Sequence, residues 1–178
     1  MRAEAVLDRA DDGVDAETRC LLSDHRIAEL LCEAKLLTMH CIQNLFASTA
    51  QGNHDADIEL IGADGDEFRV KVRQNPLQPA DFSVILMYHL PADGRWFRLR
   101  RYNGNTHQHR NRIEGDRLDF SFHVHTATER YQARGLKEDW FAEEATAHTD
   151  ARTAIECLLR DCGFATAPDP QTHLDGVV

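Results

Sequence analysis

The stretch RWFRLRRYNGNTHQHRNRIEGDRLDFSFHVHTATERY, residues 95–131, decides the fold that we expect for this chain. In residues 117–126 every second side chain is apolar, and the polar side chains between them include His123 and His125. The apolar set is Leu118, Phe120, Phe122 and Val124. A period of two is typical of a strand with one buried face. We therefore expect a strand whose apolar set faces the core and whose two histidines face outward.

Residues 95–101 show the same alternation. One set is Phe97 and Leu99, and the other is Trp96, Arg98 and Arg100. If this strand neighbours the histidine strand, its outward arginines lie beside the outward histidines. The sequence thus predicts one sheet face that carries Arg98, Arg100, His123 and His125.

The segment between these strands, residues 102–115, is polar and therefore unsuited to a core. Turn signals begin and end it, namely Asn103-Gly104 and Glu114-Gly115. Between the two turns lie His107 and His109, so we expect the loop to hold both imidazoles near the sheet face.

Basic side chains are concentrated in residues 95–117, which contain seven arginines and only two of the 30 acidic residues. The net charge of the chain is −10, so general attraction to nucleic acid or to an anionic membrane is not expected. A local positive site is expected instead. The residues predicted to contact a phosphate or an acidic partner are Arg98, Arg100, Arg101, Tyr102, Asn103, Arg110, Asn111, Arg112, Glu129, Arg130 and Tyr131.

Upstream of this stretch, Ser23 is a good N-cap for a helix whose apolar spacing extends to Leu37 or Thr38. Residues 39–47 fit either a continued helix or a short strand. Alternating residues on both sides of the turn at 63–66 predict a hairpin, and the apolar run 82–90 predicts a central strand.

Downstream, residues 126–129 have the spacing of a capping box, which predicts a short helix that ends at Gly135. Residues 136–148 suggest another, acidic helix, and Asp150 begins a last helix that ends at Gly163. The expected fold is α+β: an N-terminal helix, about five mostly antiparallel strands, and C-terminal helices packed on one sheet face. We expect a flexible acidic lead-in (1–20), a single domain (21–164) and a loose tail (165–178).

Composition predicts a cytoplasmic protein. The chain has 178 residues, 42% hydrophobic and 28% charged, which is ordinary for a globular domain. Its five cysteines are odd in number and mostly occupy apolar positions of expected helices, which favours reduced thiols over disulfides. We find no signal-peptide pattern and no apolar run of membrane-spanning length, so no membrane partner is expected.

Four runs between residues 82 and 164 resemble an uncharacterised family of small bacterial and prophage-borne proteins. They are FSVIL, RYNG-x-x-H-x-H-x-N-x-x-EG, FHVHTATERYQ and CLLRDCGF. The resemblance covers about half of the chain. It implies a bacterial or mobile-element setting, which leaves toxin, defence and phage-factor roles open.

Metal-independent RNA cleavage is one chemistry that these residues support. It needs a general base, a general acid and cations that stabilise a phosphorane. Imidazoles, with an ordinary pKa of about 6.5, suit the first two roles, and guanidinium groups suit the third. The catalytic groups would be His107, His109, His123 and His125, with no cofactor. Tyr102 or Tyr131 would stack on a base of the RNA.

A metal site is an alternative. Each His-x-His pair places two imidazoles on the same side of a strand, and four histidines suit Zn²⁺ or another divalent metal. The spacing of His107, His109 and Glu114 also matches that of cupin-type sites, although the surrounding glycine pattern does not. The neighbouring arginines oppose the binding of a dication.

A third hypothesis is a non-enzymatic module in which the basic site binds an acidic protein. A structural explanation stays open beside all three, because histidines and arginines are common on exposed strands that need no partner. The oligomeric state is not predicted.

Overall fold

The computed structural model describes residues 21–49 and 54–168 and confirms the α+β fold. The helices are α1 (Asp24–Cys32), α2 (Met39–Ser48), α3 (Glu129–Ala133) and α4 (Ala151–Asp161). The main sheet is antiparallel throughout, in the order β2 (His54–Ile61), β3 (Glu67–Asn75), β4 (Gln78–His89), β5 (Trp96–Asn103), β8 (His123–Thr126) and β9 (Ala142–Glu144). Two short sheets pair β1 (Lys35–Thr38) with β10 (Phe164–Ala167) and β6 (His109–Arg110) with β7 (Arg117–Leu118).

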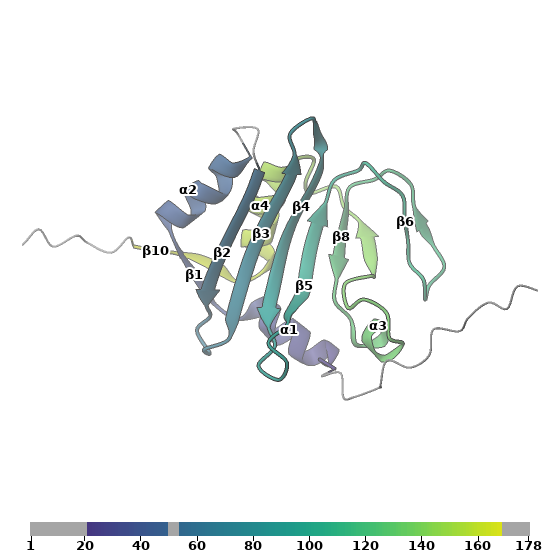
Figure 1. Ribbon diagram of the computed structural model, residues 1–178, viewed down its shortest axis with the longest axis horizontal. Helices are drawn as coiled ribbons and strands as arrows, with labels where there is room; N and C mark the ends of the chain where they lie inside the picture. Colours follow the sequence, from purple (N-terminus) through teal and green to yellow (C-terminus); the bar gives the residue numbers. More distant parts are fainter. Residues whose placement is uncertain (1–20, 50–53, 169–178) are drawn as a thin grey trace, which may run out of the picture.

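The hydrophobic core lies between the main sheet and the helices on one of its faces. Figure 1 shows α1 and α4 on the same side of the sheet, behind β3, β4 and β5. The strands contribute Phe68, Val70, Val72, Val84, Leu86, Phe97 and Leu99, and the helices contribute Ile27, Leu30, Ala154, Ile155 and Leu158. These positions alternate along the strands and recur every three or four residues along the helices, so each element buries one face. The predicted coverage of one sheet face is confirmed.

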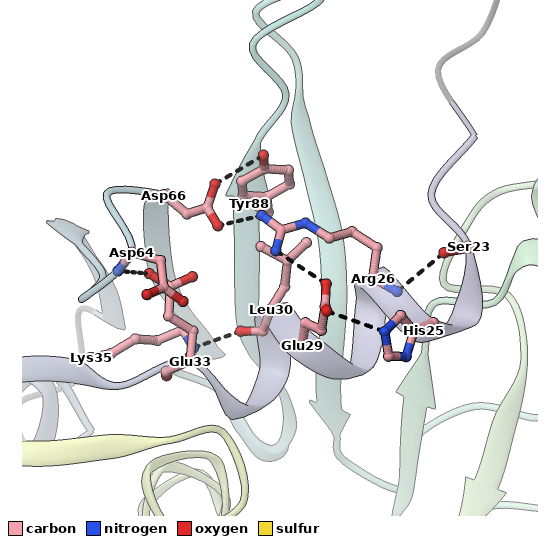
Figure 2. Close-up of polar contacts among 10 residues, drawn as sticks. All are labelled: Ser23, His25, Arg26, Glu29, Leu30, Glu33, Lys35, Asp64, Asp66 and Tyr88. Carbon is pink, nitrogen blue, oxygen red and sulfur yellow. Dashed lines mark hydrogen bonds and ion pairs between the residues drawn. The ribbon is translucent and has the colours of Figure 1, made fainter.

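The first helix ends earlier than the sequence suggested, and Lys35 begins the strand that follows it. Ser23 accepts from the Arg26 amide as the predicted N-cap, but α1 stops at Cys32 and β1 follows, so the extension to Leu37 or Thr38 was wrong. The buried ammonium of Lys35 donates to the carbonyl oxygens of Leu30 (2.7 Å), Glu33 (2.8 Å) and Cys162 (3.2 Å), as Figure 2 shows for Leu30. It thereby satisfies orphan carbonyls at the ends of α1 and α4.

Asp66 ties the β2–β3 hairpin to the helix layer. Its carboxylate accepts from Tyr88 Oη at 3.2 Å and from the guanidinium of Arg26 (Figure 2). The predicted hairpin turn at residues 63–66 and the predicted central strand, which is β4, are both confirmed. Residues 39–47, ambiguous in the sequence, lie in α2.

The last helix was predicted well. Asp150 accepts from the Thr153 amide and forms a capping box, and Gly163, with φ of 72°, follows the end of α4. Cys32, Cys41, Cys157 and Cys162 are free thiols, whereas Cys20 lies outside the described residues.

Three expectations downstream of the histidines were wrong. Residues 136–148 form loops and β9 rather than a helix, because the main chain here pairs with β8. The short helix α3 does exist, but its N-cap is Thr128, whose side chain makes no capping hydrogen bond. Residues 165–167 belong to β10, not to a loose tail, and the rest of the tail from residue 169 lies outside the described residues, as does the lead-in.

Candidate histidine site

A β-bulge in β5 decides which arginine reaches the histidines. Met87 of β4 pairs with Arg98, but the next residue, Leu86, pairs with Arg100, so Leu99 is an extra residue. Leu99 and Arg100 therefore both point to the helix side. The Nε of Arg100 is buried there without a hydrogen-bond partner, near Asp161. The expectation that Arg100 shares the histidine face was wrong.

The residues after the bulge take the position expected of Arg100. Across β5 and β8, Arg101 pairs with His125 and Asn103 pairs with His123, and directly opposed residues share a sheet face. Both imidazoles are buried, at 0% and 2% exposure, rather than solvated as expected. The regular alternation expected over residues 117–126 fails at Phe120, which is 58% exposed with φ of 49°.

The loop after β5 closes over these two histidines. The ring centroid of His107 lies 5.1 Å from that of His123, and the ring centroid of His109 lies 4.7 Å from that of His125 and 5.8 Å from that of His123. The centroids of His123 and His125 are 4.9 Å apart. We call these four residues the histidine cluster. Both His-x-His pairs of the sequence thus meet in space.

Main-chain carbonyls orient the two strand histidines. Nδ1 of His123 lies 2.7 Å from the Ser121 carbonyl oxygen, and Nδ1 of His125 lies 2.9 Å from the Asp139 carbonyl oxygen. Because a carbonyl only accepts, each Nδ1 carries the proton and each neutral ring presents its lone pair at Nε2. Both Nε2 atoms lie 3.4 Å from the same atom, Asn103 Nδ2, so both lone pairs face one point.

Burial keeps three rings of the cluster, those of His109, His123 and His125, neutral. Loss of hydration lowers the pKa of His123 to about 4, and it also lowers the pKa of His125 and of His109. The positive charge of Arg101 acts in the same direction on all three rings. At pH 7 these imidazoles are acceptors of a proton or a metal ion rather than cations.

A pocket of about 140 Å³ opens beside the cluster. It is lined by Arg101, His107, His109, His125, Lys137, Asp139 and Trp140. The Arg101 Nε donates to Asp139 Oδ2 at 2.9 Å. Asp139 is buried, with an exposed fraction of 1%. One carboxylate and two cations therefore line the pocket together with the histidines.

No protein-family model matches the chain, and comparisons with curated proteins and with solved structures give no significant match. None of the helices in the described residues has the length and apolar character needed to cross a membrane.

Asn111 and Glu114 hold the loop of residues 104–116 against the body of the protein. The Asn111 amide donates to the Ala142 carbonyl (2.8 Å) and accepts from the Ala142 amide (2.9 Å). Glu114 accepts from Tyr131 Oη at 2.6 Å and pairs with Arg130. Three of the predicted contact residues, Asn111, Arg130 and Tyr131, are thus engaged in positioning the loop.

Two further residues of the predicted set support the fold. Tyr102 is buried on the helix side, where its hydroxyl donates to Asp161 at 3.0 Å, so it does not face the pocket as a base-stacking surface would. Glu129 accepts from the Asp24 amide and links α3 to α1. The predicted turn at Asn103-Gly104 is not formed. Instead β5 runs to Asn103, the Gly104 amide donates to the Phe82 carbonyl oxygen at 3.1 Å, and a Cβ at Gly104 would lie 1.7 Å from the Ala80 carbonyl oxygen.

The remaining predicted arginines lie at the edge of the site. Arg98 Nη1 is 4.0 Å from Asp139, and Arg112 stacks on Trp140 with its guanidinium 4.1 Å from the ring centroid. Arg110 is exposed, and its carbonyl oxygen accepts from Trp140 Nε1 at 3.0 Å. The seven arginines of the stretch do not converge on one point.

Sequence reasoning missed Lys137, Asp139 and Trp140. All three lie in the segment 136–148 that was expected to be a helix, so the expected fold did not place them near the histidines. It also missed His148, whose Nε2 donates to the Asn103 carbonyl oxygen at 3.0 Å and whose buried ring packs on Tyr102. His148 thereby supports the residue that contacts both strand histidines.

The cluster has the donor atoms that a metal ion needs. Metal-bound histidines usually donate their other ring N–H to a carbonyl or carboxylate, as His123 and His125 do here. In the described part of the chain no three His, Cys, Asp or Glu side chains already form a complete ligand arrangement. Metal binding therefore requires a local adjustment in which Asn103 Nδ2 moves away from the two Nε2 atoms.

Proposed function

We propose that the histidine cluster binds a divalent transition metal ion, for which Zn²⁺ is the best match. The observation that supports this most is the orientation of His123 and His125. Both rings are fixed through Nδ1, and both Nε2 atoms face one point within the cluster. A histidine that only fills a core position needs one satisfied polar edge, not two lone pairs directed together.

The spacing of the rings supports the same proposal. Four imidazoles that bind Zn²⁺ tetrahedrally, at Zn–N distances of about 2.0–2.1 Å, have ring centroids roughly 5 Å apart. The four closest pairs in the cluster are separated by 4.7–5.8 Å. The spacing of the rings is therefore compatible with one shared metal ion.

The competing hydrogen bond is weak. An N–H···N contact of 3.4 Å is well beyond the usual distance of about 2.9–3.0 Å. The Asn103 amide therefore compensates each imidazole only weakly for the hydrogen bonds to water that it loses on burial. A metal ion supplies a much stronger partner to both lone pairs. The low proton affinity of the rings also reduces competition from protons near pH 7.

Zinc binding by the purified, metal-stripped protein tests the proposal, with His107→Ala as the main variant and His25→Ala as its control. His107 is exposed and contacts His123, whereas His25 is exposed on α1, where it pairs with Glu29. Isothermal titration should give one Zn²⁺ per chain for the wild type and the control, and an affinity lower by more than about tenfold for His107→Ala. Equal affinities in all three proteins would refute the proposal.

Metal-independent RNA cleavage is a second candidate, favoured by the presence of Arg101 and Lys137 in the same pocket as three histidines. The neutral, buried strand histidines leave His107 as the accessible ring for proton transfer. RNA cleavage that persists in a chelator and disappears in His107→Ala would support this candidate over the metal site. A non-enzymatic module that binds an acidic protein stays a prediction from the sequence.

A further inference from the structure

Two cations of the pocket have no complete set of partners. In the described residues Arg101 bonds to Asp139 through Nε, and its Nη atoms form no hydrogen bond. Lys137 is exposed, and its ammonium has the Trp140 ring, at 5.8 Å from the centroid, as its described contact. Both side chains line the pocket next to His107, His109 and His125.

The charge of the pocket favours an anion. Its lining holds two cations (Arg101 and Lys137), one carboxylate (Asp139) and three histidines. The formal sum is therefore +1 before a metal ion binds, and a divalent metal adds two more positive charges. An uncharged or cationic ligand would leave that charge uncompensated.

Shape and geometry narrow the class of anion. The Asp139 carboxylate fixes the Nε edge of the Arg101 guanidinium, which leaves the terminal nitrogens to bind two oxygens of a tetrahedral oxyanion. The pocket of about 140 Å³ has room for an ion of the size of phosphate. The Trp140 ring forms an apolar wall beside this space.

We propose that the pocket binds a phosphate oxyanion, either inorganic phosphate or a small phosphate monoester, between Arg101, Lys137 and a metal ion held by the histidine cluster. This inference rests on the proposed metal site. The anion would add a ligand to the metal ion, whose coordination can expand from four to five, and Lys137 would neutralise the charge of the outer oxygens. The substrate class of the site is thus phosphate or its small esters.

Co²⁺ in place of Zn²⁺ makes the test visible, because its absorption bands change when a ligand enters the coordination sphere. The Co²⁺-loaded protein is titrated with inorganic phosphate and, separately, with phenyl phosphate. Lys137→Ala is the variant, and Lys71→Ala, on β3 opposite Ile85, is the matched control. We expect a saturable spectral change in the wild type and in the control, and an affinity for phosphate lower by about tenfold to a hundredfold in Lys137→Ala.

The outcomes separate the two proposals. If Co²⁺ binds but neither anion changes its spectrum, or if Lys137→Ala binds phosphate like the wild type, the phosphate inference is overturned and the metal site stands. If Co²⁺ does not bind to the histidines, both proposals fall. Tighter binding of phenyl phosphate than of phosphate would identify the ester, stacked on Trp140, as the preferred form, and the reverse would identify the free ion; either result supports the inference.

Discussion

Asp139 supports two walls of the pocket at once: its carboxylate accepts from Arg101 Nε at 2.9 Å, and its main-chain carbonyl accepts from His125 Nδ1 at 2.9 Å. Substitution of the side chain separates these roles, because the carbonyl remains. In Asp139→Asn we expect zinc affinity within about threefold of the wild type, since the main-chain carbonyl oxygen of residue 139 still orients His125. We expect the free energy of unfolding to fall by about 1–3 kcal/mol, because a charge-assisted hydrogen bond is lost. Urea titrations with and without Zn²⁺ measure both quantities, and a large loss of zinc affinity would contradict the assignment.

Tyr131 positions the loop that carries His107 and His109. Its hydroxyl donates to Glu114 at 2.6 Å and accepts from the Ile113 amide at 3.3 Å. Tyr131→Phe removes both bonds, so we expect a loss of about 1–2 kcal/mol in the free energy of unfolding and a weaker zinc affinity with unchanged stoichiometry.

Tyr88→Phe is the matched control for this loop prediction. The Tyr88 hydroxyl bonds to Asp66 at the other end of the sheet, so its removal should lower stability without changing zinc affinity. Equal effects of Tyr131→Phe and Tyr88→Phe on zinc binding would show that the loop does not depend on Tyr131.

Stability should depend on pH through the buried histidines. The folded-state pKa of His123 is lowered to about 4, against about 6.5 in the unfolded chain, so the unfolded state binds more protons between these values. The free energy of unfolding of the metal-free protein is therefore expected to be constant above about pH 6.5 and to fall as the pH drops towards 4. Burial lowers the pKa values of His125 and His148 as well and deepens the fall. His123→Asn keeps a donor for the Ser121 carbonyl and should give a shallower slope in denaturant titrations; an unchanged slope would argue against a neutral, buried His123.

Gly104 is required because the backbone just after β5 passes very close to β4. A Cβ there would lie 1.7 Å from the Ala80 carbonyl oxygen, so Gly104→Ala must displace backbone and should cost more than about 3 kcal/mol. Gly65→Ala is the control: its φ of 89° is strained for alanine, but no atom lies within 4 Å, so about 1 kcal/mol is expected. Thermal melts that rank the two variants in the opposite order would contradict the packing at Gly104.

The sequence predicted the elements of the site but not which side chains meet. Alternation correctly identified β5 and the position of two histidines on one strand face, but the strand expected over residues 117–126 is formed only at β7 (Arg117–Leu118) and β8 (His123–Thr126), and its apolar set is not the buried face. It could not reveal the bulge at Leu99, because Leu99 and Arg100 remain plausible as an inward and an outward residue until the register with β4 is known. Because of this one extra residue, Arg101 rather than Arg100 lies on the sheet face that carries the histidines.

Burial was the second property that local pattern could not supply. His123 and His125 occupy the polar set of their strand, and the loop that covers them is itself polar, so solvent exposure was the natural expectation. Asn111 closes that loop through hydrogen bonds to Ala142, a residue 31 positions away, and no local spacing predicts this contact. The same long-range pairing makes residues 142–144 a strand, although their acidic surroundings suggested a helix.

The environment of the metal ion tests the central claim most directly, and X-ray absorption at the zinc edge of the Zn²⁺-loaded protein measures it. We predict a first shell of nitrogen or oxygen atoms only, at about 2.0–2.1 Å, with the outer-shell scattering of several imidazole rings, and fewer rings in His107→Ala. A sulfur shell at about 2.3 Å would place the metal at a cysteine, and a shell without imidazole scattering would place it on surface carboxylates. Either of these results would contradict a metal site at the histidine cluster.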